Sequence, residues 1–438
     1  MAAKQVSIRL SIVPGKVLLI STLICAYTYP SSVQRRFHSM ADLSVYQPLF
    51  PEERVLAPLQ DLSAQVIDTC LRLTGHGVAP VAVALRPKLR AMNSYYTNRI
   101  EGQHTRPADI ERAMRKDFDA DAAIARKQRL AVAHIDVEEE LERGSAGANP
   151  RALFSPALVR DIHKRLYEKL PQEDRITDQH EPIGPGQYRM KDVKAGLHVA
   201  PPWQEVEGLI DGWAARYSAL PGKENLLIGA ACSHHRLAWV HPFIDGNGRT
   251  ARLHTHLVLH AMGLTQGLWS PMRGLARTQE LYYAKLNNAD LLRRNDTDGR
   301  GPLSQDELVA FARYFLEVCL DQTQFMRDRL DLQTLKERLK ALLLSLQASS
   351  WEIGSEKSVI KIEALEPLHY VAMTGTLDRS RFISMTGLEE RTGRRILASL
   401  LDFGILKTET ARAPVEIAIP LKSLRFLFPN LWPEVETD

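Results

Sequence analysis

The chain has 438 residues, of which 45% are hydrophobic and 25% are charged, and its formal net charge is +4. This composition is typical of a globular protein that buries a sizeable core, and it excludes disordered, collagen-like and coiled-coil chains. The net charge is too small to indicate a nucleic-acid or membrane partner, so any basic patch must be local. The length suggests about three domains.

The cysteines indicate a reducing environment. They are scattered, without a CxxC pair or the spacing of a metal site: Cys25, Cys70, Cys232 and Cys319. A chain of this size needs no disulfide to be stable. We therefore predict buried free thiols and a cytoplasmic protein.

The N-terminus carries one contrary signal. Three basic residues precede an apolar run at residues 17–27, which has the outline of a signal peptide. The run is too short to span a bilayer, and no Ala-x-Ala site follows it. Because Met40 offers a cleaner polar start, we expect residues 1–39 to be a disordered leader or the product of a start codon placed too early. No other stretch approaches the length of a membrane span, so we expect no membrane contact.

Helical spacing dominates the first predicted domain, an N-terminal region at residues 40–140. From Leu59 to Val137 apolar residues recur at helical intervals. Pro87, Gly102 and Pro107 divide this stretch, which predicts several short helices.

The second predicted domain, residues 141–345, is mainly helical. Residues 140–150 have the composition of a linker, and a helical block follows at residues 155–170. Glycines and alternating apolar residues at 182–202 predict a short β-hairpin. Helical spacing then resumes and continues from Glu205 to about Leu344.

A third domain is expected at residues 364–438, after a linker at residues 346–363. Two short helices around a turn at Gly387 precede the strand-like segments ILKTE and VEIAI. This order predicts a helix-turn-helix with a wing. The expected fold class is therefore mainly α, with a β-hairpin and a small C-terminal winged-helix domain.

The segment His241–Arg252, HPFIDGNGRTAR, has the features of a phosphate-binding turn. Gly246 and Gly248 free the backbone to curl its N–H groups around an anion, and the helix that follows directs the positive end of its dipole to the same place. Arg249 and Arg252 are three residues apart, so they project from one face of the first helical turn. Their guanidinium groups can reach the outer phosphates of a nucleotide.

Two further residues of this segment can supply chemistry. Asp245 lies just before the turn, where a carboxylate between phosphates can hold Mg²⁺. His241 has an ordinary pKa close to neutrality, so it can take a proton from an incoming hydroxyl. A base, a metal ligand, a phosphate turn and an arginine clamp thus follow one another in the order that phosphoryl-type chemistry needs.

This segment resembles the Fic family signature, HPFx[D/N]GNGRxxR, at every specified position, and the likeness covers about half of the chain. The resemblance implies a mostly α-helical Fic core that transfers AMP from ATP to a Tyr, Thr or Ser hydroxyl of a target protein, with His241 as base and Asp245 as Mg²⁺ ligand. It implies that Asn247 and the glycine amides hold the α-phosphate region, Arg249 the β-phosphate and Arg252 the γ-phosphate. The implied nucleotide-binding set comprises Asp245, Gly246, Asn247, Gly248, Arg249, Thr250, Ala251 and Arg252.

The segment Thr97–Gly102, TNRIEG, resembles the family's inhibitory pattern [S/T]xxxE[G/N], here placed ahead of the core. An ion pair between Glu101 and Arg252 would occupy the guanidinium needed for the γ-phosphate, so that ATP would bind only unproductively. The resemblance therefore implies that Glu101 is an autoinhibitory switch.

The predicted hairpin resembles the family's flap, whose exposed edge pairs with an extended target segment. The residues implied to cover the nucleotide are Val193, Lys194, Ala195 and Gly196.

Tyr282 and Tyr283 resemble the family's paired tyrosines beside the adenine, with core packing as an equal alternative. Asp290 stands where relatives often have Asn, so a nucleotide contact is in doubt there.

Two other signals point away from this chemistry. His256 and His260 have the i,i+4 spacing of a zinc pair, but no third ligand is evident in the sequence. We therefore expect these histidines to lie on polar faces of their helix and not to bind a metal. Three arginines lie where a winged helix contacts DNA: Arg391, Arg394 and Arg395. Residues 365–438 nevertheless carry nine Lys and Arg against ten Asp and Glu, a net charge of −1, so DNA binding is not favoured over protein contact or dimerisation.

The leading hypothesis is a Mg²⁺- and ATP-dependent protein adenylyltransferase, held inactive by Glu101, whose partner is a protein with an exposed hydroxyl side chain. Within the enzymes, the alternative is removal of AMP from a modified protein, with Glu101 orienting a water molecule. The non-enzymatic alternative is a DNA-binding regulator that uses the Fic core as a nucleotide sensor. The sequence does not determine the target or whether the chain forms a homodimer.

Overall fold

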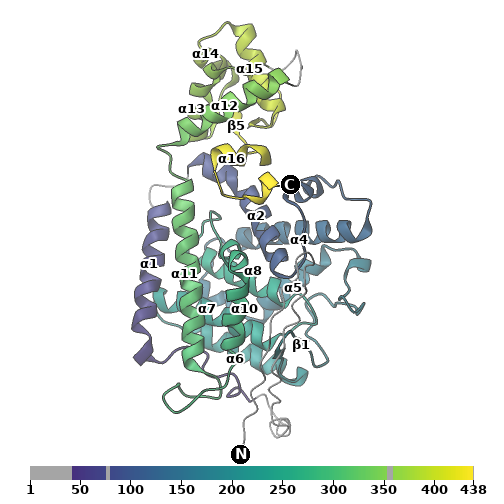
Figure 1. The fold of residues 1–438 in the computed structure, drawn as a ribbon, viewed down its shortest axis with the longest axis vertical. Helices are drawn as coiled ribbons and strands as arrows, with labels where there is room; N and C mark the ends of the chain where they lie inside the picture. Colours follow the sequence, from purple (N-terminus) through teal and green to yellow (C-terminus); the bar gives the residue numbers. More distant parts are fainter. Residues whose placement is uncertain (1–41, 75–78, 353–358, 438) are drawn as a thin grey trace, which may run out of the picture. The chain divides into compact units, whose positions relative to one another are not determined.

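The structure is a computed structural model that describes residues 42–74, 79–352 and 359–437 (Figure 1). The predicted leader at residues 1–39, Cys25 and residues 353–358 of the predicted linker lie outside the described residues. Within the described ranges, no helix combines the length and apolar character needed to cross a bilayer. Most of the regular structure is α-helical, which confirms the predicted mainly-α fold class.

Four helices make up the N-terminal region: α1 (Ala57–Thr74), α2 (Pro80–Ile100), α3 (Pro107–Met114) and α4 (Ala122–Gly144). Pro87 lies inside α2, so the predicted break there is wrong. A proline removes one N–H donor, but its ring is exposed here and the long helix continues through it. Asp121 caps α4, which runs to Gly144, so the first half of the predicted 140–150 linker is helical.

Eight helices follow: α5 (Pro156–Glu168), α6 (Val206–Ser218), α7 (Lys223–Val240), α8 (Asn247–Ala261), α9 (Met272–Arg277), α10 (Gln279–Asn288), α11 (Gln305–Arg329) and α12 (Leu335–Glu352). Helix α7 packs against α1, α6, α8 and α11, and its residues 226–237 are all buried. It is therefore the central helix of the core, and it leads directly into the 241–252 segment. Helix α12 extends to Glu352, so the start of the predicted 346–363 linker is helical.

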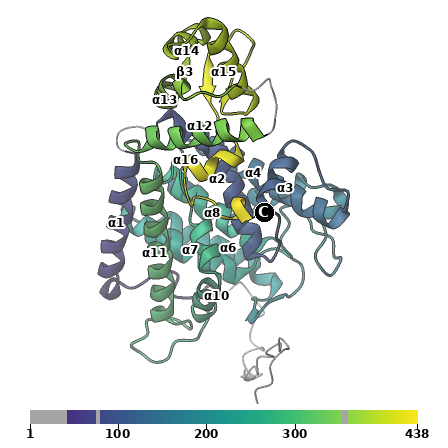
Figure 2. The same cartoon turned by 45° about the horizontal axis from the view of Figure 1, so that its top comes forward.

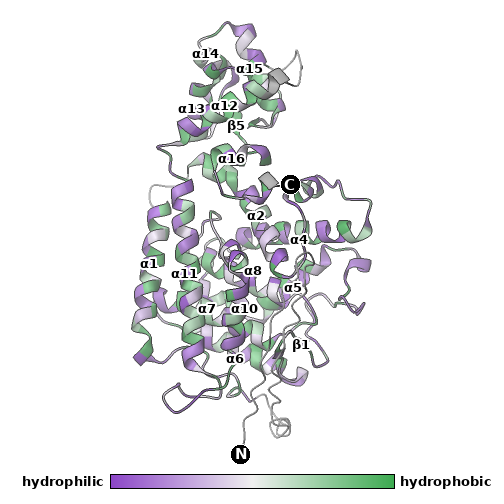
Figure 3. Ribbon diagram, in the orientation of Figure 1, coloured by the Kyte–Doolittle hydropathy of each residue, from purple (hydrophilic) through white to green (hydrophobic). Residues whose placement is uncertain are grey.

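The outer helices α1 and α11 lie side by side (Figures 1 and 2). Both alternate hydrophilic and hydrophobic residues along their length (Figure 3), as expected of helices with one buried and one solvated face. Cys70 in α1, Cys232 in α7 and Cys319 in α11 are buried, and the prediction of a buried free thiol is confirmed for Cys232 and Cys319.

The predicted β-hairpin is present but very short. Strands β1 (Lys194–Ala195) and β2 (His198–Val199) pair antiparallel, and Gly196 takes a positive φ of 61° in the turn between them. Short 3-10 turns lie at Glu53–Val55, Pro150–Leu153, Gln172–Asp174, Trp203–Glu205, Ile362–Ala364 and Leu421–Ser423.

The C-terminal elements are α13 (Leu365–Thr374), β3 (Thr376–Leu377), α14 (Arg379–Met385), α15 (Glu390–Asp402), β4 (Leu406–Lys407), β5 (Val415–Ile417), α16 (Leu424–Leu427) and α17 (Glu434–Thr437). The three strands form an antiparallel sheet in the order β3-β5-β4, and α14 packs against α15 across the turn at Gly387 (Figure 2). The final residues return to α2, where the ring of Trp432 meets that of Tyr95 edge to face.

Candidate active site

Two left-handed residues shape the loop between α7 and α8. His241 ends α7 with φ 50° and ψ 58°, and Gly246 precedes α8 with φ 77°. A positive φ costs free energy at a residue with a side chain, and such strain clusters at functional sites. No side chain caps the start of α8. The first N–H groups of this helix therefore point outward at the turn, where they can bind an anion.

The loop is braced from inside. Asn247 uses both ends of its side-chain amide on Phe243, accepting from the Phe243 N–H and donating to its carbonyl, each at 2.8 Å. The Phe243 ring stacks on His163 of α5, with centroids 3.8 Å apart. His163 Nδ1 accepts from the Gly186 N–H, so Nε2 carries the proton and donates to the Asp245 carbonyl at 3.1 Å. Asn247 thus shapes the loop, and its expected contact with the α-phosphate stays a prediction.

His241 is set up as a neutral imidazole. Burial, and after it the neighbouring His198, lower the pKa of His241 to about 4. Its Nδ1 lies 3.4 Å from the Ala238 carbonyl, and an N–H at that position leaves the lone pair on Nε2. Arg189 donates to the His241 carbonyl at 2.8 Å and so fixes the backbone of this residue. A base with these properties accepts a proton at neutral pH.

Arg249 is 3% exposed and has spare hydrogen-bonding capacity. Its Nη2 donates to the Tyr167 hydroxyl at 3.0 Å and approaches Asp245 Oδ1 at 3.4 Å. Among the described residues, no acceptor reaches its Nε or Nη1, although both atoms are buried. Buried guanidinium groups without partners are costly, so these N–H groups indicate an anionic ligand.

Asp245 has the donor chemistry for Mg²⁺. Its carboxylate is 37% exposed and lies beside the Arg249 guanidinium and the N–H of Gly246. Mg²⁺ prefers carboxylate oxygens, and in nucleotide sites it is held by one or two of them together with phosphates and water. A single accessible carboxylate at the mouth of an anion site fits that pattern.

Arg252 lies deeper and is engaged by the end of α2. Its Nη2 forms an ion pair with Glu101, and its Nε donates to the Thr97 hydroxyl at 2.6 Å. Burial alone would raise the pKa of Glu101, but Arg252 and Arg249 hold it below its ordinary value. A side chain at position 248 would crowd the Glu101 carboxylate and the Arg252 guanidinium, so a larger residue there would displace the ion pair. The predicted ion pair between Glu101 and Arg252 is thus present, and its regulatory role stays a prediction.

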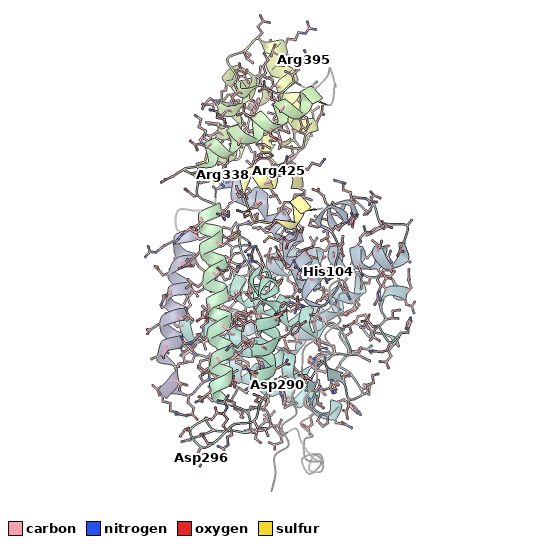
Figure 4. All side chains as sticks on the ribbon, in the orientation of Figure 1. His104, Asp290, Asp296, Arg338, Arg395 and Arg425 are labelled. Atoms are coloured by element: carbon pink, nitrogen blue, oxygen red, sulfur yellow. The ribbon has the colours of Figure 1, made fainter. Side chains whose placement is uncertain are left out.

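The hairpin is fastened to the core by a carboxylate. Asp290, which is labelled in Figure 4, bonds His198 of β2 at 2.9 Å and His235 of α7 at 3.0 Å. His198 Nε2 also lies 2.7 Å from the Trp239 carbonyl. Asp290 therefore positions the hairpin, which gives this carboxylate a role other than the nucleotide contact that was in doubt. Residues 193–196 lie on this hairpin, partly or fully exposed, and their predicted contact with the nucleotide is untested.

The two tyrosines differ in accessibility. Tyr282 is 2% exposed, and its hydroxyl lies 2.7 Å from His234, so it belongs to the core and offers no free face to a base. Tyr283 is 40% exposed and donates to the Ile100 carbonyl at the end of α2. The adenine contact stays a prediction for both tyrosines, and the burial of Tyr282 favours the alternative of core packing at that position. Thr250 and Ala251 are each 1% exposed, and a nucleotide contact of their side chains also stays a prediction.

Four residues that build this site were given no role of their own by the sequence: His163, Tyr167, Arg189 and His198. Arg189 and His198 lie within the predicted hairpin segment, and His163 and Tyr167 are single polar residues of a helix. They contact the 241–252 loop from positions about 40 to 80 residues away in the chain. Only the folded arrangement shows them.

Most of this site lies in a segment that matches a known protein family. Residues 153–259 match the model of the Fic/DOC family, so the chain contains a Fic domain. Protein adenylyltransferase Fic of Drosophila willistoni is 32% identical over 114 residues, which are 25% of this chain and 22% of that protein. Its namesake in Nematostella vectensis is 32% identical over 119 residues, 26% of each chain. Protein adenylyltransferase fic-1 of Caenorhabditis briggsae is 32% identical over 146 residues, 32% of this chain and 27% of that protein. The chain thus spans about a quarter of the length of the curated relatives it matches.

Solved structures of similar proteins include a Fic family protein from Desulfovibrio desulfuricans, with TM-score 0.49 and 16% identity, covering 86% of this chain and 99% of that one. Fic-1 of C. elegans (residues 134–508) has TM-score 0.46 and 20% identity, covering 62% and 73% of the two chains. These likenesses are too weak to carry an inference.

Proposed function

We propose that this protein transfers AMP from ATP to a hydroxyl side chain of a target protein and releases pyrophosphate. The observation that carries the proposal is the pairing of a neutral His241 with an uncapped helix start, beside which Arg249 keeps two buried N–H groups without acceptors in the described structure. The names of the relatives, protein adenylyltransferases, support the same activity.

The chemistry follows from the chain's own groups. His241 Nε2 takes the proton of the target hydroxyl, whose oxygen then bonds to the α-phosphorus of ATP. The bond from that phosphorus to the oxygen bridging to the β-phosphate breaks, and pyrophosphate leaves. Arg249 and the N–H groups at the start of α8 stabilise the negative charge on the phosphates. Mg²⁺, held by Asp245, would offset charge on the leaving group.

The resting state is inhibited in this proposal. Glu101 occupies the Arg252 guanidinium that would hold the γ-phosphate, and its charge also acts on Arg249. A triphosphate therefore competes with a carboxylate already in place. Displacing the end of α2 would free Arg252 and let ATP bind productively.

The hairpin provides a place for the target. Three large apolar side chains on this segment are exposed, at 76%, 71% and 68%: Met190, Leu197 and Val199. Their exposure, together with the free edge of a two-stranded sheet, suits an extended target segment that adds a strand. Such binding uses mainly main-chain hydrogen bonds, so it can position a target hydroxyl near His241 without a strict requirement for the target sequence.

A second candidate reaction is removal of AMP from a modified protein. The low pKa of Glu101 keeps it ionised, and its charge acts on His241, so it could orient a water molecule for attack on the phosphodiester. Loss of AMP from a pre-modified target that depends on Glu101 would favour this reaction.

We propose a winged-helix module for the C-terminal elements, because a helix-turn-helix is followed by two strands that pair with a third. Its near-zero charge favours a role in protein contact, including dimerisation. A salt-dependent DNA mobility shift that Arg394→Ala abolishes and His241→Ala preserves would instead favour a DNA-binding regulator.

The decisive experiment incubates purified full-length protein with α-³²P-ATP and Mg²⁺ and counts label transferred to protein. We expect weak labelling by the wild type and an increase of about tenfold or more in Glu101→Gly, since removing the carboxylate frees Arg252. His241→Ala in the Glu101→Gly background should lose about 100-fold or more. No label from Glu101→Gly, or equal label after His241→Ala, would exclude the proposed transfer.

A further inference from the structure

A second cluster of ligand-type side chains lies between α4 and α8. His134, Glu138 and Glu142 follow one another at intervals of four on α4, so they share one helix face, and His256 of α8 meets them. His256 Nε2 lies 2.9 Å from Glu142 Oε1 and 3.6 Å from Glu138 Oε1. The ligand atoms of Glu138, Glu142 and His256 all lie within 4.8 Å of one another. The spacing in the sequence pairs His256 with His260, whereas the two carboxylates of the cluster, Glu138 and Glu142, come from α4.

The cluster is buried and incompletely satisfied. His134 is fully buried, Glu138 is 1% exposed and Glu142 is 5% exposed. In the described part of the chain, neither ring nitrogen of His134 has a hydrogen-bond partner, and Glu138 Oε2 has none. These two unpartnered groups face each other, with His134 Nδ1 3.6 Å from Glu138 Oε2. A buried imidazole and a buried carboxylate oxygen without partners indicate that something is missing from the cluster.

We propose that Glu138, Glu142 and His256 bind a divalent transition-metal ion, Zn²⁺ by ligand chemistry. One imidazole and two carboxylates are the nitrogen and oxygen donors that zinc takes. Two ligands at about 2.1 Å from a tetrahedral zinc lie about 3.4 Å apart, between the 2.9 Å and 3.6 Å that separate His256 from the two carboxylates. The ion binds the two helices together.

Groups around the ligands hold them in place. Asn93 of α2 donates to Glu138 Oε1 at 2.7 Å, and Arg90 of α2 donates two hydrogen bonds to Glu142 Oε2. Glu142 Oε1 and the second lone pair of Glu138 Oε1 remain for the ion, and Glu138 Oε2 faces His134. With both carboxylates ionised on a metal, the His134 N–H gains an acceptor in Glu138.

One of the three ligands, Glu142, also borders a cleft, whereas Glu138 and His256 do not line it. The cleft has a volume of about 400 Å³ and is also lined by His260, Arg86, Arg90 and Arg143. His256 lies one turn beyond Arg252 on the same helix, so a metal here anchors the helix that begins at the proposed phosphate site. The site contains none of the residues assigned to AMP transfer, and its metal is distinct from Mg²⁺ at Asp245.

The test measures zinc in the full-length, tag-free protein after expression with added ZnCl₂ and exhaustive desalting. Mass spectrometry of the metals should find about one zinc per chain in the wild type, and far less in His256→Gln and Glu142→Gln. His260→Gln is the matched control, because it changes a histidine in the same cleft, four residues on, that lies 3.9 Å from Glu142 without joining the cluster. This variant should keep its zinc.

A second measurement does not depend on the variants folding. Wild-type protein stripped with a chelator is titrated with CoCl₂ alone, and should develop the visible absorption of Co²⁺ at low coordination number and gain thermal stability. Absence of both zinc and a Co²⁺ spectrum in the wild type would overturn the proposal and leave a buried ion-pair network. Zinc retained equally by folded His256→Gln would overturn it as well, since that metal would be adventitious.

Discussion

The reactivity of His241 comes from its surroundings rather than from its residue type. An exposed histidine is half protonated near pH 6.5, and only the neutral half can then act as a base. Burial behind the hairpin and the nearby His198 keep this ring neutral well below that pH. The left-handed backbone at His241, held by Arg189, fixes the direction from which the ring acts.

A pH profile of the Glu101→Gly variant tests this protonation state. Since the pKa of His241 is about 4, its base stays neutral from pH 8 to pH 5.5, and kcat/KM for AMP transfer should stay nearly constant over that range. Initial rates with α-labelled ATP measure it. A fall of about tenfold between pH 7 and pH 5.5 would show that His241 titrates near its ordinary pKa.

Asp290 can be tested as a positioning residue. Asp290→Asn weakens the bonds to His198 and His235, so the hairpin is held less firmly. In the Glu101→Gly background we expect KM for a protein target to rise about three- to tenfold while KM for ATP changes little. Steady-state kinetics with each substrate varied in turn separate the two. The exposed Asp296, which can be changed to Asn in the same way, is the control and should leave both constants unchanged. Equal rises in both KM values would mean that Asp290 supports the whole site.

At the level of elements, helix α2 connects the C-terminal segment to the proposed inhibitory glutamate. Glu434 of α17 accepts hydrogen bonds from Tyr96 at 2.8 Å and from Arg99 at 2.9 Å, both on the last turns of α2. Glu101 follows directly and engages Arg252. Tyr283 and Gln279 of α10 hold the Ile100 carbonyl at the same helix end. The position of Glu101 is therefore supported from two elements that lie far along the chain.

Loosening that support should raise basal activity. Glu434→Gln removes the charge that pairs with Arg99, so the end of α2 should leave Arg252 more often, and labelling by otherwise wild-type protein should rise about two- to fivefold. Glu409→Gln, at an exposed position, is the control and should not change it. The same change in the Glu101→Gly background should have no effect, because the inhibitory carboxylate is already gone. An equal increase in that background would assign Glu434 another role.

For the whole molecule, the number of buried neutral histidines determines how it responds to acid. Burial lowers the pKa of five histidines to about 3 or 4: His163, His234, His241, His254 and His260. An unfolded chain has histidines with a pKa near 6.5, so between about pH 6.5 and pH 4 the unfolded state binds more protons than the folded state. The free energy of unfolding is therefore unaffected by these histidines above about pH 6.5, and it decreases as the pH falls towards 4.

Thermal unfolding should show this dependence. Each of these histidines removes up to about 3 kcal/mol from the free energy of unfolding as the pH falls from 6.5 to 4, so the Tm should drop steeply over this interval and little between pH 7 and pH 8. Differential scanning calorimetry in buffers of matched ionic strength measures it. A Tm that is flat from pH 7 to pH 5 would contradict the low pKa values.

Features that depend on neighbouring residues could be predicted before the fold was known. The helices, the hairpin turn at Gly196 and the phosphate-binding turn at 241–252 are local, because backbone freedom, helix caps and the first-turn arginines act within a few residues. The ion pair of Glu101 with Arg252 could be anticipated only because the motif resembled a known family. Other features arise only from packing: the helix running through Pro87, the burial of Tyr282, the His198–Asp290–His235 bridge and the metal-type cluster of α4 and α8. These depend on desolvation and on distances between side chains from separate elements, and neither quantity exists until the helices pack.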